Sequence, residues 1–385
     1  MRGSESKSFS VGTMTLIPYV TGAERMEALL ALIANAQSSL RLLYYIFAKD
    51  ESGEKIRDAL VAARLRGVDV SLTIDGFGSS ATDAFLAPLA QAGADICRFL
   101  PRFGRRYLLR NHQKLALADE ARAIIGGFNI ADDYFADEGR NHWRDLGLGV
   151  EGDAARRLAG YYDALSAWSR KPTARLRQLR QALGHWSDKE GPVRWLLGGP
   201  TRRLNPWARA AKTDLRQAKR LDLISAYFFP SPVMLGRIAS VARRGGVANV
   251  MTASKSDSEI TIAAARHSYH RLLKHGVGIW EYRPARLHTK LLVLDDAVYI
   301  GSANFDMRSL YLNLELMLRV EDKDFADYMR AYAEGERRLA QPITRQLHNR
   351  RRTWFASIRW SFAYFLVGVL DSSITRRLNF GSHWR

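Results

Sequence analysis

The feature that most constrains this chain is an internal repeat. A strand, a helix and a second strand are predicted at residues 41–47, 54–66 and 68–74. The same order recurs later in the chain, at residues 221–228, 233–244 and 247–252. A further helix follows in each copy, at residues 82–92 and 261–275. Alternating strands and helices are typical of a parallel sheet, so we expect an α/β fold built from two halves related by a pseudo-twofold axis.

Each copy of the repeat is followed by a His-x-Lys triplet. The first is His112-Gln113-Lys114 and the second is His288-Thr289-Lys290. From the numbers of His and Lys in 385 residues, chance would give about 0.3 such triplets in the whole chain. Chance is therefore a poor explanation for two triplets at equivalent positions of a repeat.

Residues two apart on a strand point to the same face of the sheet. His112 and Lys114 should therefore project together, and so should His288 and Lys290. Each half then offers a base or nucleophile beside a fixed cation, which is a pairing suited to an anionic substrate.

Three further residue types recur at the same or nearly the same distances after the triplets. Asp119 and Asp295 each follow a Lys by five residues, at expected turns, and we predict structural roles for them within the motif. Asn129 and Asn304 follow at the end of the next expected strand, where they can donate hydrogen bonds to phosphoryl oxygens. The small residues before them let the backbone approach a ligand. They are Gly126, Gly127, Gly301 and Ser302, and we include Ser302 among the phosphate-binding residues.

Two carboxylates lie downstream of the Asn residues. A nucleophilic His works best when a carboxylate holds its other ring nitrogen, because this fixes the tautomer and raises basicity. Asp145 and Glu315 are the candidates, each within an expected strand. The alternative is that both are ordinary surface carboxylates.

Net charge and cysteine content limit the partners and the compartment. The formal net charge of +19 favours phosphate-rich partners, either nucleic acid or an anionic membrane surface. A single cysteine, Cys97, excludes an internal disulfide framework and is typical of the reducing cytoplasm. The first residues are polar and lack the apolar stretch of a signal peptide.

The repeat divides the chain into halves at residues 1–170 and 206–345. Residues 171–205 show no sustained apolar period, so we interpret them as a helix tail and a linker. The remaining residues, 346–385, form a basic and aromatic tail. Its apolar part, residues 354–370, is too short to cross a bilayer and contains Arg359, so we expect an interfacial helix. The alternative is a helix buried against the core.

The paired His-x-Lys-x4-Asp motifs resemble the phospholipase D superfamily. Within it, residues 196–200, 226–230, 255–257 and 302–309 are most similar to bacterial cardiolipin synthases of the short kind without membrane anchors. The resemblance implies that both motifs meet at one cleft on the twofold axis. It also implies that one His is the nucleophile, the other is the general acid and base, and no metal or other cofactor takes part. The implied catalytic residues are His112, Lys114, Asp119, His288, Lys290 and Asp295.

The activity implied by the resemblance is phosphatidyl transfer. One phosphatidylglycerol would donate its phosphatidyl group to another, giving cardiolipin and glycerol through a phosphohistidine. We expect peripheral association with the cytoplasmic side of the inner membrane and no nucleic-acid partner. The alternative is a phosphodiesterase of the same superfamily that acts on nucleic acid or hydrolyses phospholipid.

Overall fold

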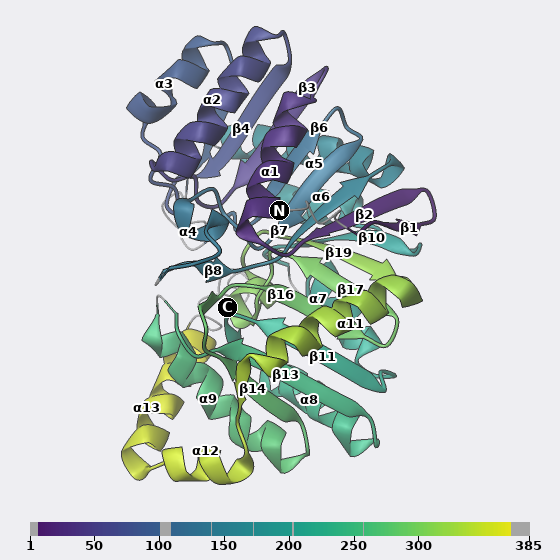
Figure 1. The fold of residues 1–385 in the computed structure, drawn as a ribbon, viewed down its shortest axis with the longest axis vertical. Helices are drawn as coiled ribbons and strands as arrows, with labels where there is room; N and C mark the ends of the chain where they lie inside the picture. Colours follow the sequence, from purple (N-terminus) through teal and green to yellow (C-terminus); the bar gives the residue numbers. More distant parts are fainter. Residues whose placement is uncertain are drawn as a thin grey trace, which may run out of the picture.

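Two eight-stranded sheets form the framework of the protein (Figure 1). The computed structural model describes residues 7–100, 109–139, 141–171, 173–201, 204–256 and 258–370. In spatial order, the first sheet contains β1 (Phe9–Val11), β2 (Met14–Tyr19), β9 (Gly147–Glu151), β7 (Arg122–Gly126), β6 (Leu115–Ala118), β3 (Ser39–Tyr44), β4 (Asp69–Asp75) and β5 (Asp95–Phe99). The second contains β10 (Val193–Gly198), β19 (Glu315–Glu321), β17 (Ala297–Gly301), β16 (Lys290–Leu294), β11 (Arg220–Ser225), β13 (Val247–Ala253), β14 (Gly278–Tyr282) and β20 (Ala340–Pro342).

Seven strands of each sheet have the same order and directions, and each sheet has one further edge strand, β1 next to β2 in the first and β20 next to β14 in the second. Strands β3, β4 and β5 are parallel, as are β11, β13 and β14, whereas all the other pairs in both sheets are antiparallel. The predicted fold class, two pseudo-twofold-related α/β halves, is confirmed. The expected parallel arrangement holds only for the strands joined by helices, because β6–β7 and β16–β17 are hairpins that can only be antiparallel.

Helices cover the outer face of each sheet. On the first sheet they are α1 (Gly22–Ala34), α2 (Glu51–Leu65) and α3 (Asp83–Gln91), and on the second they are α7 (Pro206–Asp214), α8 (Pro232–Arg243) and α9 (Glu259–Lys274). Helix α2 illustrates why they form. The Asp50 carboxylate accepts a hydrogen bond from Gly53 N at 2.9 Å, and Ile56, Leu60 and Ala63 form a buried stripe toward the sheet.

The inner faces of the two sheets share one hydrophobic core. Leu115 and Leu117 of β6 belong to the same buried cluster as Leu291 and Val293 of β16. This core also contains buried side chains of α5 (Asp153–Arg170) and α11 (Lys323–Arg338). Removing a Leu side chain from water contributes about 1.5–3 kcal/mol, so the core holds the halves together strongly.

The segment that joins the halves is more ordered than its sequence predicts. Residues 171–205 contain α6 (Leu176–Trp186) and β10, which pairs antiparallel with β19. The linker interpretation is therefore corrected. Leu179 and Leu183 of α6 are buried, but the Arg and Gln residues between them obscure the helical period. Strand β10 joins the second sheet by non-local pairing, which periodicity does not reveal.

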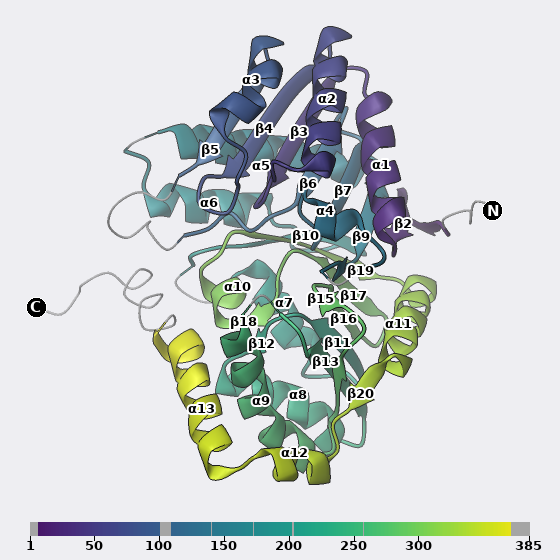
Figure 2. The same ribbon diagram turned by 60° about the vertical axis from the view of Figure 1, so that its left-hand side comes forward.

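Short elements complete the fold near the middle of the molecule and at its C-terminal end. They are α4 (Asp132–Phe135), β8 (Trp143–Arg144), β12 (Phe228–Phe229), β15 (Arg286–Leu287), β18 (Phe305–Asp306), α10 (Met307–Tyr311), α12 (Arg345–Arg351), α13 (Trp354–Tyr364) and a π-helical turn, η1 (Phe365–Leu370). Figure 2 shows α13 alongside α9 at the edge of the second half. Among the described residues, no helix has both the length and the apolar character needed to span a bilayer.

Candidate active site

Two backbone junctions bring each His-x-Lys motif to the opposite half. Strand β15, just before His288, pairs in parallel with β8 of the first half, and His288 N donates to Arg144 O at 2.8 Å. In the equivalent junction, Asn111 forms a bridge with Leu314, and His112 N donates to Leu314 O at 3.0 Å. Each motif therefore lies beside the carboxylate-bearing segment of the other half.

The two imidazoles are held by carboxylates that cross between the halves. Nδ1 of His112 lies 3.1 Å from Oε2 of Glu315, and Nδ1 of His288 lies 2.6 Å from Oδ2 of Asp145. An ionised carboxylate only accepts hydrogen bonds, so Nδ1 carries the proton and Nε2 keeps its lone pair. The sequence suggested both carboxylates but not their partners, and the structure pairs each with the His of the opposite half.

The two motif lysines are buried behind the imidazoles. Lys114 Nζ donates to His112 O at 2.6 Å, and Lys290 Nζ donates to His288 O. Their side chains are almost completely buried, with residue exposures of 1% and 2%. Each cation therefore fixes the backbone of its own His and places positive charge beside the site.

Burial and these cations keep both imidazoles neutral. Burial, followed by the Lys114 cation, lowers the pKa of His112, although Glu315 acts in the opposite direction. Burial and Lys290 likewise lower the pKa of His288 to about 3 against the effect of Asp145. Burial also lowers the pKa of Lys114 to about 7. At neutral pH each His therefore presents an unprotonated Nε2.

Both His side chains line one cavity of about 440 Å³ between the halves, together with Asn129 and Asn304. The amide of Asn129 is oriented by Ile46 N, which donates to its Oδ1 at 3.1 Å. The structure thus brings together four of the predicted site residues at the surface of the cavity.

Aromatic side chains form much of the cavity wall and were not predicted from the sequence. They are Tyr45, Phe77, Tyr134, Trp143, Tyr227 and Phe229. The rings of Tyr134 and Trp143 lie 5.1 and 5.3 Å from the ring of His288, and the ring of Tyr45 lies 5.1 Å from that of His112. These aromatics come from loops and short elements, where no periodic pattern marks them.

Ser302 occupies a different place from the one predicted. Its hydroxyl donates to Glu315 Oε2 at 2.5 Å, and Ser309, which the sequence analysis missed, donates to Glu315 Oε1 at 2.8 Å. Ser302 does not line the cavity, so its predicted contact with phosphate is corrected to a contact with the carboxylate. Gly127 occupies the equivalent position in the first half, where a Cβ would lie 2.4 Å from Asp145 Oδ1.

Asp119 and Asp295 lie at the opposite ends of β3 and β11 from the cavity. Asp119 Oδ1 accepts hydrogen bonds from Ser38 N and Ser39 N at 2.8 and 3.1 Å, and Asp295 Oδ1 accepts one from Arg220 N at 2.8 Å. Both residues have positive φ, 53° and 48°, a conformation that Asp tolerates better than most residues. This geometry supports the structural roles expected within the motif rather than contact with substrate.

Replacing Asp119 with Asn should lower stability and leave the turnover number nearly unchanged. Partial burial raises the pKa of Asp119, but backbone N–H donors, Ser38 and Ser39 first, outweigh it and lower that pKa overall. The stabilisation is therefore present at neutral pH and is lost as the pH falls below about 4. We expect a loss of about 1–3 kcal/mol at pH 7 that shrinks in acid, measured by denaturant unfolding. A large fall in turnover without unfolding would contradict this role.

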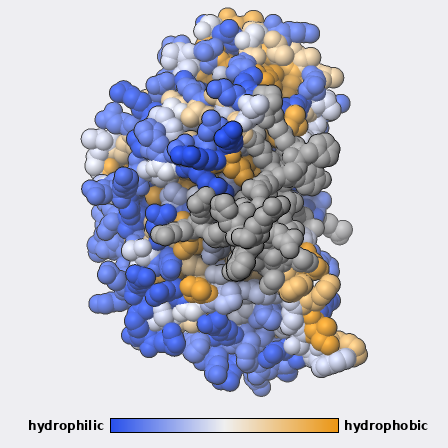
Figure 3. Space-filling view, turned by 180° about the vertical axis from the view of Figure 1, so that it is seen from behind, coloured by the Kyte–Doolittle hydropathy of each residue, from blue (hydrophilic) through white to orange (hydrophobic). Residues whose placement is uncertain are grey.

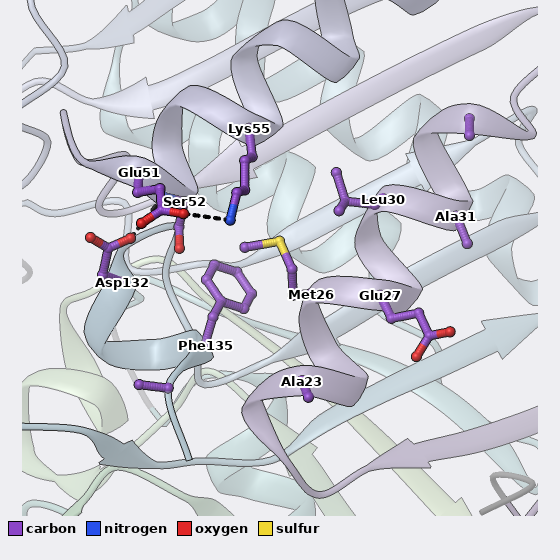
Figure 4. A pocket seen from close by; sticks show the side chains of 12 residues that line it. Ala23, Met26, Glu27, Leu30, Ala31, Glu51, Ser52, Lys55, Asp132 and Phe135 are labelled. Carbon is purple, nitrogen blue, oxygen red and sulfur yellow. Dashed lines mark hydrogen bonds and ion pairs between the residues drawn. The ribbon is translucent and has the colours of Figure 1, made fainter. Parts of the chain in front are cut away.

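A second hollow lies on the outside of the first half (Figure 4). It has a volume of about 890 Å³ and lies between α1, α2 and α4, with Met26, Leu30 and Phe135 on its apolar floor. Helix α4 separates this hollow from the cavity between the halves, because its Tyr134 lines the cavity and its Phe135 lines the hollow. No described His residue lines this hollow, whereas both motif His residues line the cavity between the halves.

Comparison with known proteins identifies the family. The model "Cardiolipin synthase, PLD-like domain" matches residues 29–146 and 212–336, one segment in each half. Cardiolipin synthase B of Salmonella typhimurium is 32% identical over 333 residues, which cover 82% of this chain and 78% of that protein. Cardiolipin synthase 1 of Bacillus cereus is 32% identical over 331 residues, covering 81% and 64%.

A solved structure supports the fold independently. The crystal structure of phosphatidylserine synthase from Haemophilus influenzae superimposes with a TM-score of 0.73 at 13% identity and covers 96% of both chains. The resemblance inferred from the motifs is confirmed. The chain is an enzyme that belongs to the cardiolipin synthase family of phospholipase D-like phosphatidyltransferases.

Proposed function

We propose that this enzyme makes cardiolipin from two molecules of phosphatidylglycerol and releases glycerol. The observation that carries the proposal is the pair of neutral imidazoles at one cavity, each held through Nδ1 by a carboxylate from the other half. Such a pair can supply a nucleophile and an acid or base for two successive displacements at phosphorus.

In the first displacement, Nε2 of His112 attacks phosphorus and a P–N bond forms as the P–O bond to glycerol breaks. His288 takes up a proton from solvent at Nε2 when the substrate binds, and it gives this proton to the departing glycerol oxygen. The entering phosphodiester anion favours the protonated form of His288, because an opposite charge nearby stabilises an imidazolium. Asn129, Asn304 and the two motif lysines stabilise the charge on the non-bridging oxygens.

In the second displacement, His288 takes the proton from the primary hydroxyl of another phosphatidylglycerol. That oxygen attacks phosphorus, the P–N bond to His112 breaks, and cardiolipin forms. If water takes the place of the lipid alcohol, the product is phosphatidic acid. The aromatic wall of the cavity disfavours water and so favours transfer.

Rapid-quench trapping tests the covalent step and the choice of nucleophile. With phosphatidylglycerol labelled in the phosphate, we expect a base-stable, acid-labile phosphoryl group on His112, following the N-terminal nucleophile of the superfamily. Label on His288 would reverse the two roles, and label on neither would contradict the covalent mechanism. Single-stranded DNA serves as the rival substrate, and its cleavage in place of cardiolipin formation would favour the nuclease alternative.

Helix α13 supports peripheral docking on a membrane. One face packs against α9 through Trp360 and Ala363, which are buried. The other face exposes large apolar side chains, and those described on the helix and on η1 are Trp354, Phe355, Ile358, Phe362 and Phe365. In the view from behind, hydrophobic surface gathers at the corner where α13 lies (Figure 3). The helix therefore combines the two expected arrangements, one face in the core and the other open to lipid.

The charges around α13 favour an anionic surface. Arg350, Arg352 and Arg359 are exposed near the apolar face, and Val367 of η1 lines the active-site cavity. Docking through this face would hold the cavity close to its lipid substrate. The hydroxyl of Tyr364, the last residue of α13, donates to Pro230 O at 2.9 Å. Arg376 and Arg377, two further basic residues of the tail, lie outside the described residues. We propose the cytoplasmic leaflet of the inner membrane, whose anionic lipids attract basic residues.

Chelators are expected to leave activity intact. Lys290 supplies positive charge where a metal-dependent enzyme would use a cation, and the anionic phosphodiester favours the protonated form of Lys114 as well. Imidazole serves as the nucleophile. Turnover of phosphatidylglycerol in EDTA should match turnover in untreated buffer within about twofold. Loss of activity that is restored by zinc or magnesium would contradict this expectation.

A further inference from the structure

The repeat is asymmetric at one position of the cavity wall. Trp143 precedes Asp145 by two residues, and Asn313 precedes Glu315 by two residues. Both line the cavity. Their backbones are equivalent as well. Trp143 pairs with Arg286, which lies two residues before His288. The N–H of Leu314, the residue after Asn313, donates to the carbonyl oxygen of Arg110, which lies two residues before His112. The first half therefore offers an aromatic ring at a position where the second half offers an amide.

Two amide oxygens on the wall from the second half lack hydrogen-bond partners. Oδ1 of Asn313 and Oδ1 of Asn304 are both buried, and neither has a partner among the residues that the structure describes. The two residues are 8% and 2% exposed. A buried carbonyl oxygen without a partner is unfavourable, so such a group in a binding cavity is suited to a donor on the ligand.

The chemistry of the substrate identifies that donor. A phosphodiester at neutral pH and the acyl esters of a phospholipid offer only acceptors. In phosphatidylglycerol, the hydroxyls of the glycerol headgroup are the only hydrogen-bond donors. By contrast, Trp143 packs against Tyr134, with ring centroids 5.8 Å apart, and has no acceptor oxygen in its side chain.

We propose that Asn313, together with Asn304, binds hydroxyls of the glycerol headgroup and that Asn313 makes the cavity selective for a polyol alcohol. The proposal rests on the proposed use of phosphatidylglycerol and adds the residue that recognises its headgroup. Asn304 is also proposed to bind the phosphate, whereas Asn313 lies outside both His-x-Lys motifs. Asn313 is therefore the residue at which recognition of the alcohol can be tested separately.

The test compares two small diesters that differ only in hydroxyls, glyceryl methyl phosphate and propyl methyl phosphate. Their dissociation constants are measured by calorimetry for the wild-type protein, Asn313→Leu and Asn313→Ala. One or two hydrogen bonds to otherwise unpaired groups should make the wild-type protein favour the glyceryl diester by about tenfold. Both variants should reduce the preference to below about twofold, mainly by weakening binding of the glyceryl diester.

Asn349→Ala is the matched control, since Asn349 is exposed on α12 and is not among the residues that line the cavity. It should keep the wild-type preference. Asn313→Ala removes the same oxygen without adding bulk, so it covers the case in which Asn313→Leu does not fold. Equal weakening of both diesters, an unchanged preference, or no preference in the wild-type protein would overturn the inference.

This binding experiment needs no turnover, so it can fail separately from the proposed function. Cardiolipin formation from phosphatidylglycerol vesicles by the wild-type protein tests the function. A protein that makes cardiolipin but keeps its preference after substitution of Asn313 overturns only the role of Asn313. A protein that makes no cardiolipin but loses the preference in the variants overturns only the proposed reaction.

Discussion

Replacing Asp145 with Asn should reduce cardiolipin formation by about 10³- to 10⁴-fold, the scale seen when a His loses its orienting carboxylate in other enzymes. The Asn amide removes the negative charge beside His288 and can present an N–H group to Nδ1, which favours the wrong tautomer. Glu315→Gln should act in the same way on His112. The measurement is the initial rate of cardiolipin formation from phosphatidylglycerol, with thermal unfolding recorded for each variant.

The matched control is Asp163→Asn. Asp163 is an exposed carboxylate that pairs with Arg41 at 2.9 Å and lies outside the cavity. This variant should keep wild-type turnover, because an exposed ion pair contributes little to stability and none of its atoms reaches the site. A folded Asp145→Asn protein that retains turnover within tenfold of wild type would contradict the role assigned to the crossed carboxylates.

The second large effect is expected on the membrane. Replacing Trp354, Phe355 and Ile358 together with Ser should weaken sedimentation with anionic vesicles by about 100-fold or more, because three large apolar side chains can no longer leave water. Turnover on vesicles should fall in parallel, whereas turnover of detergent-dispersed lipid should stay near the wild-type value. Binding by the wild-type protein should weaken as salt is raised, since Arg350, Arg352 and Arg359 act through screened charge.

Exposed apolar residues elsewhere provide the control for this experiment. Leu65, Val247 and Leu339 are 76%, 58% and 60% exposed and lie outside α13 and η1. Their replacement with Ser should leave vesicle binding unchanged. Point substitutions are preferable to truncation after Asn349, because truncation would also remove Trp360 and uncover its packing surface on α9. If the α13 variant still sediments as the wild-type protein does, the docking role is wrong.

The sequence by itself determined the duplicated α/β architecture and the two histidines of the proposed reaction, His112 and His288. Both depend on patterns that are local and periodic. The strand–helix–strand order follows from side-chain periodicity within each copy, and the two His-x-Lys triplets stand out because they recur at equivalent places. Asn129 and Asn304 could be suggested for the same reason, since they follow their His residues by 17 and 16 positions. Asp145 and Glu315 follow theirs by 33 and 27 positions, and they were suggested because a nucleophilic His needs a carboxylate partner.

Only the tertiary structure decided how these residues are combined. Each carboxylate meets the His of the other half, across sequence separations of 203 and 143 residues, and no local pattern specifies which partner it takes. The same holds for Ser302 and Ser309 behind Glu315, for β10 at the edge of the second sheet, and for the aromatic wall of the cavity. These arrangements follow from the core that the two sheets share, because its packing fixes the position of one half relative to the other. That packing exists only in the folded chain.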